Sequence, residues 1–227
     1  MWTFPRVAWA RDLLPGAQVV VAPRAAFSGP VSVGGTTVEL DGAEGGISHI
    51  HGHGNASRWA WLHAALDADA LLEVVTAVST RPGLDRLPPS AFLRFRLDGR
   101  DWPSGPFPAA RVRTRLGAQR WSLDGGVGRH RVSVWVDQPP DRSVALEYVD
   151  PDGETAVCTN TERADVDVLL ERRSGGRWIV DRHWELAGTG HAEVGLRGSA
   201  APPVRERRPD GDRDEGRDGG RDREERP

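Results

Sequence analysis

The sequence predicts an all-β protein, an antiparallel lipocalin-like barrel with a β-sandwich as the alternative. Apolar and charged residues alternate with a period of two, as at 93–97, where Leu, Phe and Leu alternate with Arg, and again at 112–116. Such alternation is typical of strands that bury one face. Gly, Pro, Asp and Asn bound the alternating segments, and few windows have helical spacing. Because open strand edges invite aggregation, this many antiparallel strands are expected to close into a barrel or to stack.

In chain order, the pattern predicts a short helix near residues 7–14 and then ten or more strands. Strands are expected over 18–22, 31–40, 58–66, 71–78, 93–97, 112–116, 121–123, 131–137, 144–149, 155–159, 165–171, 177–186 and 191–196. The sequence Asp-Pro-Asp-Gly-Glu at 150–154 separates two of them, and its Pro and Gly supply the φ angles of a tight turn. Ser-Gly-Gly-Arg at 174–177 predicts a second hairpin.

One domain with a tail is expected from the 227 residues. Residues 1–29 are interpreted as a connector that carries the short helix and a first strand, and residues 30–197 as the lipocalin-like barrel. The segment 205–227 holds eight Arg and nine Asp or Glu but no apolar residue. It cannot bury enough surface to order itself, so residues 198–227 are predicted to form a disordered tail.

Composition excludes several classes of function. The net charge is −3, so no positive field is available to attract phosphate, and no nucleic-acid partner is expected. Cys158 is the only cysteine, which rules out an internal disulfide and favours the cytoplasm. No run approaches the ~20 apolar residues of a membrane span. Nucleophile-elbow, P-loop and dinucleotide motifs are absent, which argues against hydrolases and nucleotide-dependent enzymes.

The segment 45–67 is the strongest candidate for a binding site, because it holds four of the seven His and two of the nine Trp. On the strand predicted there, Trp59, Trp61 and His63 share one face. If that face lines a barrel interior, it presents two indoles and an imidazole to a ligand. Indole faces supply apolar area and stabilise a desolvated cation by ~1–2 kcal/mol. The alternative is that these side chains are only packing residues.

Four further polar residues are candidates at this pocket. Asn55, Arg58 and Glu73 would fix the orientation of a ligand there. Tyr148, the only tyrosine, is a candidate whose face depends on the strand register.

Three histidines at spacing two raise the possibility of a metal site. His49, His51 and His53 would lie on one side of an extended strand, as chelating imidazoles do. His191 and Glu193, which face the same way on the last predicted strand, would complete the ligand set. The glycines between the histidines favour the alternative, an exposed loop without a metal.

Four stretches of the sequence resemble a known family. FPRVAWARDLLPGAQVVVAP, HIHGHGNASRWAWLHA, YVDPDGETAVCTNTERADV and GTGHAEVGLR are similar to the AttH-type family, which is related to carotenoid 1,2-hydratases and tocopherol cyclases. The resemblance covers most of Phe4–Arg197. It implies a protein of two consecutive lipocalin-like halves, of which this chain matches mainly the second. A separate N-terminal lipocalin-like half is therefore a possible partner.

The resemblance also implies an activity. Family members enclose a polyene, terpenoid or polyketide and catalyse hydration, cyclisation or another redox-neutral rearrangement that begins with an acid. A Gly-x-His element followed by Asn and by Trp-x-Trp corresponds to Gly52, His53, Asn55, Trp59 and Trp61. The chain lacks the aromatic–acid–His–Asn–Trp order of the true hydratases.

The chemistry of such a reaction suggests roles for the residues. Protonation of an alkene needs an acid shielded from water, and the carbocation must then be stabilised. His51, His53 or Glu73 would donate the proton, while the indoles stabilise the cation. Alternatively, the pocket only folds the substrate into a reactive conformer. Neither route needs a cofactor. A non-catalytic carrier of an apolar molecule and a metal-dependent β-barrel enzyme are the alternatives.

Overall fold

The computed structural model describes residues 16–52, 54, 56–102, 112–127 and 129–198. These residues form antiparallel strands and one 3-10 turn (Pro140–Arg142), with no α-helix among them, which confirms the all-β prediction. The strands are β1 (Gly16–Val33), β2 (Thr36–Gly52), β3 (Arg58–Ala65), β4 (Ala70–Val78), β5 (Ser90–Leu97), β6 (Arg100–Trp102), β7 (Val112–Leu116), β8 (Arg120–Val127), β9 (His130–Asp137), β10 (Val144–Val149), β11 (Thr155–Ser174) and β12 (Arg177–Arg197).

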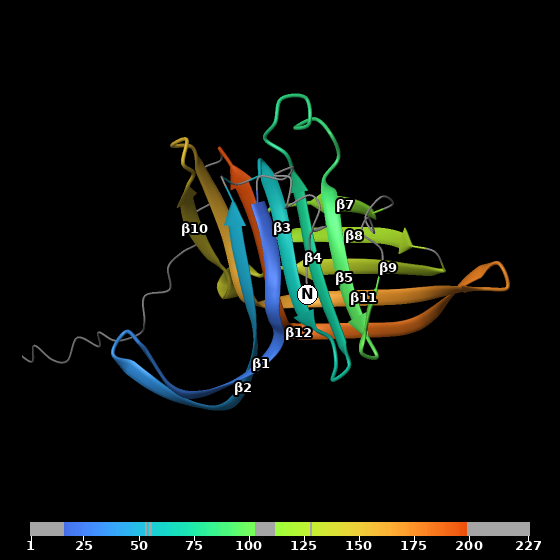
Figure 1. Cartoon of the computed structure of the whole chain (residues 1–227), viewed down its shortest axis with the longest axis horizontal. Coiled ribbons are helices and arrows are strands. Elements are labelled where there is room, and N and C mark those ends of the chain that lie inside the picture. The colour runs from blue at the N-terminus through green and yellow to red at the C-terminus, as the bar shows by residue number, and fades with distance from the viewer. Residues whose placement is uncertain (1–15, 53, 55, 103–111, 128, 199–227) are drawn as a thin grey trace, which may run out of the picture.

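One antiparallel sheet holds ten of the strands and folds over on itself. Its strand order is β6-β5-β4-β3-β12-β11-β9-β8-β7, with β10 paired to β11. Figure 1 shows β3, β4 and β5 running upright and β7, β8 and β9 running across them. The terminal strands β6 and β7 do not pair, so the expectation of a closed barrel is wrong. A side-chain hydrogen bond of 3.2 Å from Thr76 to Thr114 links β4 to β7 without joining their backbones.

The long strands β11 and β12 connect the two layers. The first layer consists of β3, β4 and β5 with the end of β12, and the second consists of β7, β8 and β9 with the later part of β11. The register of β11 with β12 shifts on both sides of Ala164, and these bulges bend the strands. Separate strands predicted at 155–159 and 165–171, and at 177–186 and 191–196, are therefore single bent strands.

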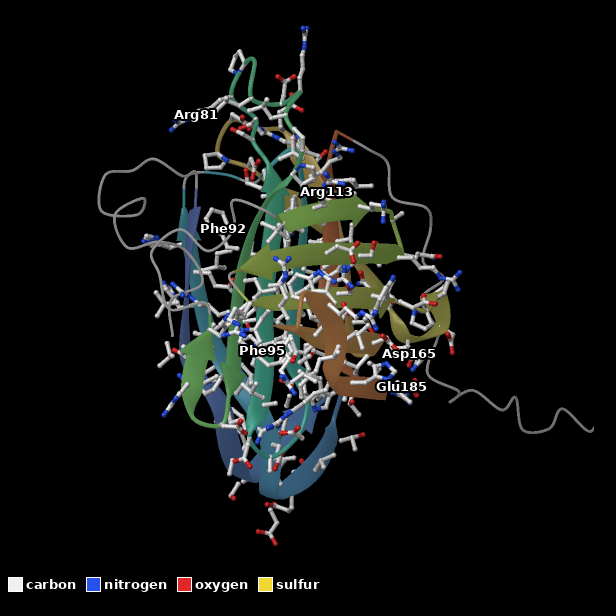
Figure 2. All side chains as sticks on the ribbon, turned by 90° about the vertical axis from the view of Figure 1, so that its right-hand side faces the viewer. Arg81, Phe92, Phe95, Arg113, Asp165 and Glu185 are labelled. Carbon is white, nitrogen blue, oxygen red and sulfur yellow. The ribbon has the colours of Figure 1, made fainter. Side chains whose placement is uncertain are left out.

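The hydrophobic core lies between these two layers. Alternate residues of each strand point into it, as the period-two pattern predicts. Phe95 of β5 is 1% exposed at the centre of the core and is labelled in Figure 2. The core side chains of the first layer include Ala60, Leu62, Leu72 and Val74, and those of the second include Leu123, Val134, Val168 and Leu170.

Strands β1 and β2 form a separate hairpin that covers the outer face of the first layer. Gly34 and Gly35 make its turn with φ angles of 57° and 81°, a conformation that side chains with a Cβ rarely adopt. The strand predicted over 31–40 is therefore wrong, because the chain reverses at its centre. Gln18 attaches the hairpin to Glu73 of β4, and Arg24 donates to backbone carbonyls in the β3–β4 turn, including that of Ala70 at 3.3 Å.

Both hairpins predicted from turn sequences are confirmed. The Asp150 amide donates to the Glu154 carbonyl at 2.8 Å, and Gly153 has a φ of 85°. In the second hairpin, Gly175 and Gly176 take φ angles of 55° and 80° between β11 and β12. Figure 1 shows this β11–β12 turn projecting beyond the rest of the sheet.

Three further predictions concern the ends of the chain and its location. The helix near 7–14 and the tail from 199 onward lie outside the described residues. No helix in the described part of the chain is long and apolar enough to cross a bilayer. A cytoplasmic location stays a prediction.

The two-layer core makes a prediction about stability. Leu72 is 0% exposed between the layers, so Leu72→Ala should lower the free energy of unfolding by about 2–5 kcal/mol through lost burial and a residual cavity. Leu146 of β10 is 42% exposed and provides the matched control, because its truncation removes little buried area. Urea denaturation measures the free energy of unfolding of both variants. Equal losses would contradict the placement of the core.

Candidate functional site

The candidate site occupies the face of the first layer that points away from the core. Trp59, Trp61 and His63 share this face, as predicted from their spacing, while the alternate residues of β3 enter the core. The site therefore does not line a barrel interior. It lies between the first layer and the β1–β2 hairpin. The interior, where a hollow was expected, is filled by packed hydrophobic side chains.

Glu73 of β4 is the centre of the site. It is 0% exposed, and three side chains hydrogen-bond to its carboxylate. The Trp61 indole donates to Oε1 at 2.6 Å and the Gln18 amide donates to the same oxygen at 3.1 Å. His63 Nδ1 lies 2.7 Å from Oε2. A buried carboxylate is costly unless donors satisfy it, and these donors come from two strands, β1 and β3.

His63 is enclosed by the neighbouring strands. Its ring stacks on Trp61 with a centroid distance of 6.3 Å and an interplanar angle of 22°. A Cβ on Gly46 of β2 would lie 3.1 Å from His63 Nε2, so the hairpin passes directly over the imidazole. Because Nδ1 is bonded to Glu73, Nε2 is the ring nitrogen that remains for proton transfer.

A second histidine adjoins the first. His191 of β12 is the cross-strand partner of His63, and the two ring centroids lie 5.7 Å apart in an edge-to-face arrangement. His191 Nδ1 pairs with the Glu162 carboxylate. That hydrogen bond raises the pKa of His191 and lowers the pKa of Glu162, each against an opposing contribution from burial. The pair favours an imidazolium at the edge of the site.

Trp59 belongs to a second polar group. Its indole donates to Glu193 Oε1 at 2.9 Å, and the Cys158 thiol lies 3.5 Å from Oε2. The indole covers Gly195, where an added Cβ would lie only 2.0 Å from the ring. Burial is the main cause that raises the pKa of the Cys158 thiol and that of Tyr148, the latter to about 12. Both groups therefore stay protonated at neutral pH.

The remaining predicted site residues are dispersed. His49 and His51 lie on β2, exposed, with ring centroids 6.1 Å apart, and Arg58 is exposed at the start of β3. His53 and Asn55 lie outside the described residues. His191 and Glu193, expected to complete a metal site with these histidines, bond instead to Glu162 and to Trp59.

Comparison with known proteins identifies the family. The model of the family described as tocopherol cyclase-like matches residues 5–196. The chain belongs to the tocopherol cyclase-like family. This confirms the resemblance read from the sequence.

Relatives of this tocopherol cyclase-like chain include two proteins of Mycobacterium tuberculosis, uncharacterized protein MT0513 of strain CDC 1551 and uncharacterized protein Rv0493c of strain H37Rv. Each is 57% identical over 209 residues, which is 92% of this chain and 61% of the relative. The chain thus spans less than two thirds of the length of these relatives.

Two solved structures are similar to the chain. The crystal structure of CghA with Sch210972 has a TM-score of 0.47 and 14% identity, covering 82% of this chain and 56% of that one. Kievitone hydratase from Nectria haematococca has a TM-score of 0.46 and 11% identity, covering 81% and 53%.

Two residues of the site in this tocopherol cyclase-like chain were not foreseen from the sequence. Gln18 has the appearance of an ordinary strand residue, and its role arises only when the hairpin docks. Glu162 falls where the register of β11 shifts, so alternation does not predict its face. The regular position of Glu73 opposite His63 on the next strand was the usable signal.

The His191–Glu162 pair predicts a pH dependence of stability. Because its pKa is raised above the ordinary histidine value of 6.5, protonated His191 stabilises the folded protein at pH values below 6.5. This stabilisation is lost as the pH rises through the pKa of the folded state. The lowered pKa of Glu162 gives stability that is lost as pH falls through its own folded pKa. The stability advantage over Glu162→Gln should therefore be largest in mildly acidic solution and should shrink above neutrality.

Chemical denaturation across this pH range measures the advantage, and NMR titration reports the pKa of His191 directly. In Glu162→Gln, that pKa should fall toward its ordinary value. Glu147→Gln, an exposed change on β10, is the control and should leave it unchanged. An unshifted pKa of His191 in the unmodified protein would contradict the pairing.

Proposed function

We propose that this face of the first layer is an acid–base site for a redox-neutral rearrangement of an apolar polyene, terpenoid or polyketide. The observation that carries the proposal is the juxtaposition of two differently paired imidazoles, His63 on Glu73 and His191 on Glu162, beside the indole of Trp61. Pairs of titratable groups in contrasting environments are typical of acid–base sites.

His191 is the proposed proton donor. With Nδ1 bonded to Glu162, the Nε2–H of the imidazolium gives its proton to a substrate alkene, leaving a carbocation. His63, oriented by Glu73, is the proposed acceptor. In hydration it takes the proton of the water that adds to the cation, and in cyclisation it takes a proton from carbon. Solvent then restores both imidazoles, so the sum of the steps consumes no oxidant or reductant.

The surroundings suit a cationic intermediate. Trp61 presents an indole beside His63, and an indole face stabilises a desolvated cation by about 1–2 kcal/mol. The hairpin above His63 limits access of water, which would capture the cation prematurely. Of the proton donors expected from the sequence, His51 is exposed on β2, His53 lies outside the described residues, and Glu73 is here the residue that orients His63.

Gln18 suggests what the substrate carries. Its Oε1 is buried next to Glu73 and has no hydrogen-bond partner among the described residues. A buried acceptor without a donor is costly, and a hydroxyl group on the substrate would satisfy it. An oxygenated polyene therefore suits the site better than a pure hydrocarbon.

Ligand binding tests the site. All-trans-retinol, an apolar polyene with a hydroxyl, should quench tryptophan fluorescence and bind more tightly than retinyl acetate, which has no donor for Gln18. Trp61→Ala should raise the Kd for retinol about tenfold, corresponding to ~1.4 kcal/mol of lost aromatic contact. Trp178→Ala, beside Arg131 on the opposite layer, is the control and should leave the Kd unchanged. Equal affinity in all variants would contradict the site.

Solvent isotope incorporation separates an enzyme from a carrier. Protonation of an alkene in D2O places deuterium on carbon. If this chain is an enzyme, geranylgeraniol incubated with it in D2O should gain deuterium, which mass spectrometry detects. His191→Gln should abolish incorporation, whereas His130→Gln, on β9, should not. Retinol and geranylgeraniol that bind without any deuterium incorporation would support the non-catalytic carrier.

We also propose that a further lipocalin-like half packs against the β1–β2 hairpin and β10, next to this site. The relatives are longer than this chain, and the hairpin and β10 expose many apolar side chains. Those at least 42% exposed are Val21, Val31, Val33, Val38, Ile47, Ile50, Val144, Leu146 and Val149. Exposed apolar side chains in this number are typical of an interaction surface.

Association with that half is measurable. The part of the Mycobacterium tuberculosis relative outside the matched residues, expressed separately, should bind this chain in size-exclusion chromatography. Ile50→Asp, at 71% exposure on β2, should prevent binding, whereas Val180→Asp, at 61% exposure on β12, should not. Failure of the two proteins to associate would contradict the proposed partner and leave the acid–base site untouched.

A further inference from the structure

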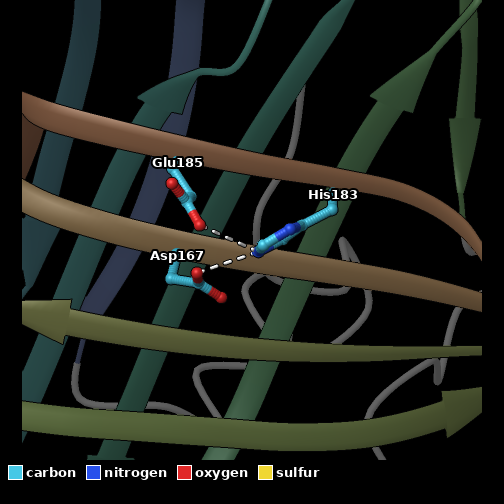
Figure 3. A group of neighbouring side chains, drawn as sticks. All are labelled: Asp167, His183 and Glu185. Carbon is cyan, nitrogen blue, oxygen red and sulfur yellow. Dashed lines mark hydrogen bonds and ion pairs between the residues drawn. The ribbon is translucent and has the colours of Figure 1, made fainter.

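A second cluster of metal-ligating side chains lies on the second layer. Asp167 of β11 and Glu185 of β12 are direct cross-strand partners, and His183 lies two residues before Glu185 on the same face. His183 Nε2 is 2.9 Å from Asp167 Oδ2 and 3.8 Å from Glu185 Oε1. Figure 3 shows both carboxylates directed at the same nitrogen. None of these residues belongs to the acid–base site.

The strands fix the backbone positions of the three residues, while their side chains are 38–77% exposed. Both chain neighbours of Asp167 are buried in the core. Trp184, which separates His183 from Glu185, packs against the core on the inner side and donates its indole N–H to Asp67 at 2.7 Å. Ligands carried by packed strands keep their relative positions better than ligands carried by loops.

The charges of the cluster are not balanced. Two carboxylates directly opposite each other on neighbouring strands repel. The nearby arginines bond to other carboxylates: Arg142 to Asp165, Arg172 to Asp181 and Arg182 to Asp98. Among the described residues, the basic side chain that pairs with Asp167 and Glu185 is that of His183. Even when protonated, it offsets only one of the two negative charges.

The distances suit a small divalent ion. Ligand atoms about 2.0–2.2 Å from zinc lie roughly 3.3–3.6 Å apart at the tetrahedral angle. The observed separations of 2.9 and 3.8 Å bracket that range, and all three ligand atoms lie within 4.8 Å of one another. We propose that Asp167, His183 and Glu185 bind a divalent transition-metal ion, with Zn²⁺ as the ion that this imidazole–carboxylate set fits.

The environment of the cluster leaves room for a further ligand. Asp167 and Glu185 line a cavity of about 690 Å³, together with Trp121 and Trp135. Figure 2 labels Glu185 beside Asp165, which lines the same cavity. Three protein ligands leave one position of a four-coordinate ion for water or for a molecule in the cavity.

The metal competes with a proton. Nε2 of His183 lies against Asp167 Oδ2, and coordination through this nitrogen requires it to carry no proton. The affinity for Zn²⁺ therefore falls as the pH is lowered. This dependence distinguishes coordination by the imidazole from nonspecific attraction of a cation to the two carboxylates.

Calorimetry with Zn²⁺ and the visible absorption of Co²⁺ test the proposal on the full chain. One equivalent of metal ion should bind per chain. The double variant Asp167→Asn/His183→Gln should raise the Kd at least about 100-fold, because it removes two of the three ligands. Circular dichroism should show an unchanged fold, since the side chains are partly exposed and their backbone positions are fixed by the core.

The histidines of β2 provide the matched control. The triple variant His49→Gln/His51→Gln/His53→Gln removes the other candidate chelators and should leave the Kd for Zn²⁺ unchanged. Binding lost in this variant but retained in Asp167→Asn/His183→Gln would overturn the proposal. So would millimolar or weaker binding by the unmodified chain, which marks the cluster as an ordinary surface ion pair.

Discussion

A buried carboxylate sets the strictest condition on this molecule. Glu73 has no contact with solvent, so its two oxygens must be satisfied by donors that the fold supplies. Trp61 and His63 from β3 and Gln18 from β1 meet this condition. The same three bonds therefore fix the indole, the tautomer of the imidazole and the position of the hairpin. Satisfying one carboxylate assembles the site, because Oε1 accepts from both Trp61 and Gln18 while Oε2 pairs with His63.

The position of that carboxylate follows from strand alternation and from how the sheet folds. Residues on one parity of β3 and β4 form the aliphatic core, so the other parity must face away from it. In a closed barrel the outward face would meet solvent, and indoles there would be exposed. Here the β1–β2 hairpin provides a third layer, which lets β4 be buried on both faces and gives the outward polar residues a sheltered space.

The sequence was informative where structure depends on neighbouring residues and uninformative where it depends on distant ones. Alternation located most strands and placed Trp59, Trp61 and His63 on one face, and turn residues located two hairpins. The Gly34–Gly35 turn was missed, although two adjacent glycines are a hairpin signal. Closure of the sheet and the contact of Gln18 with Glu73 join residues far apart in the chain. Periodicity carries no information about such pairings.

The bend of β12 explains how one strand serves both candidate sites. His183 and Glu185 lie before it, and His191 and Glu193 lie after it. Gly188 has a φ of 69°, and a Cβ on Gly190 would lie 2.4 Å from a methyl group of Val166. The positive φ at residue 188 favours glycine, and a side chain at residue 190 would displace Val166 of β11. Because the chain changes direction there, one strand serves both groups. His191 bonds to Glu162 beside His63 after the bend, and His183 bonds to Asp167 before it.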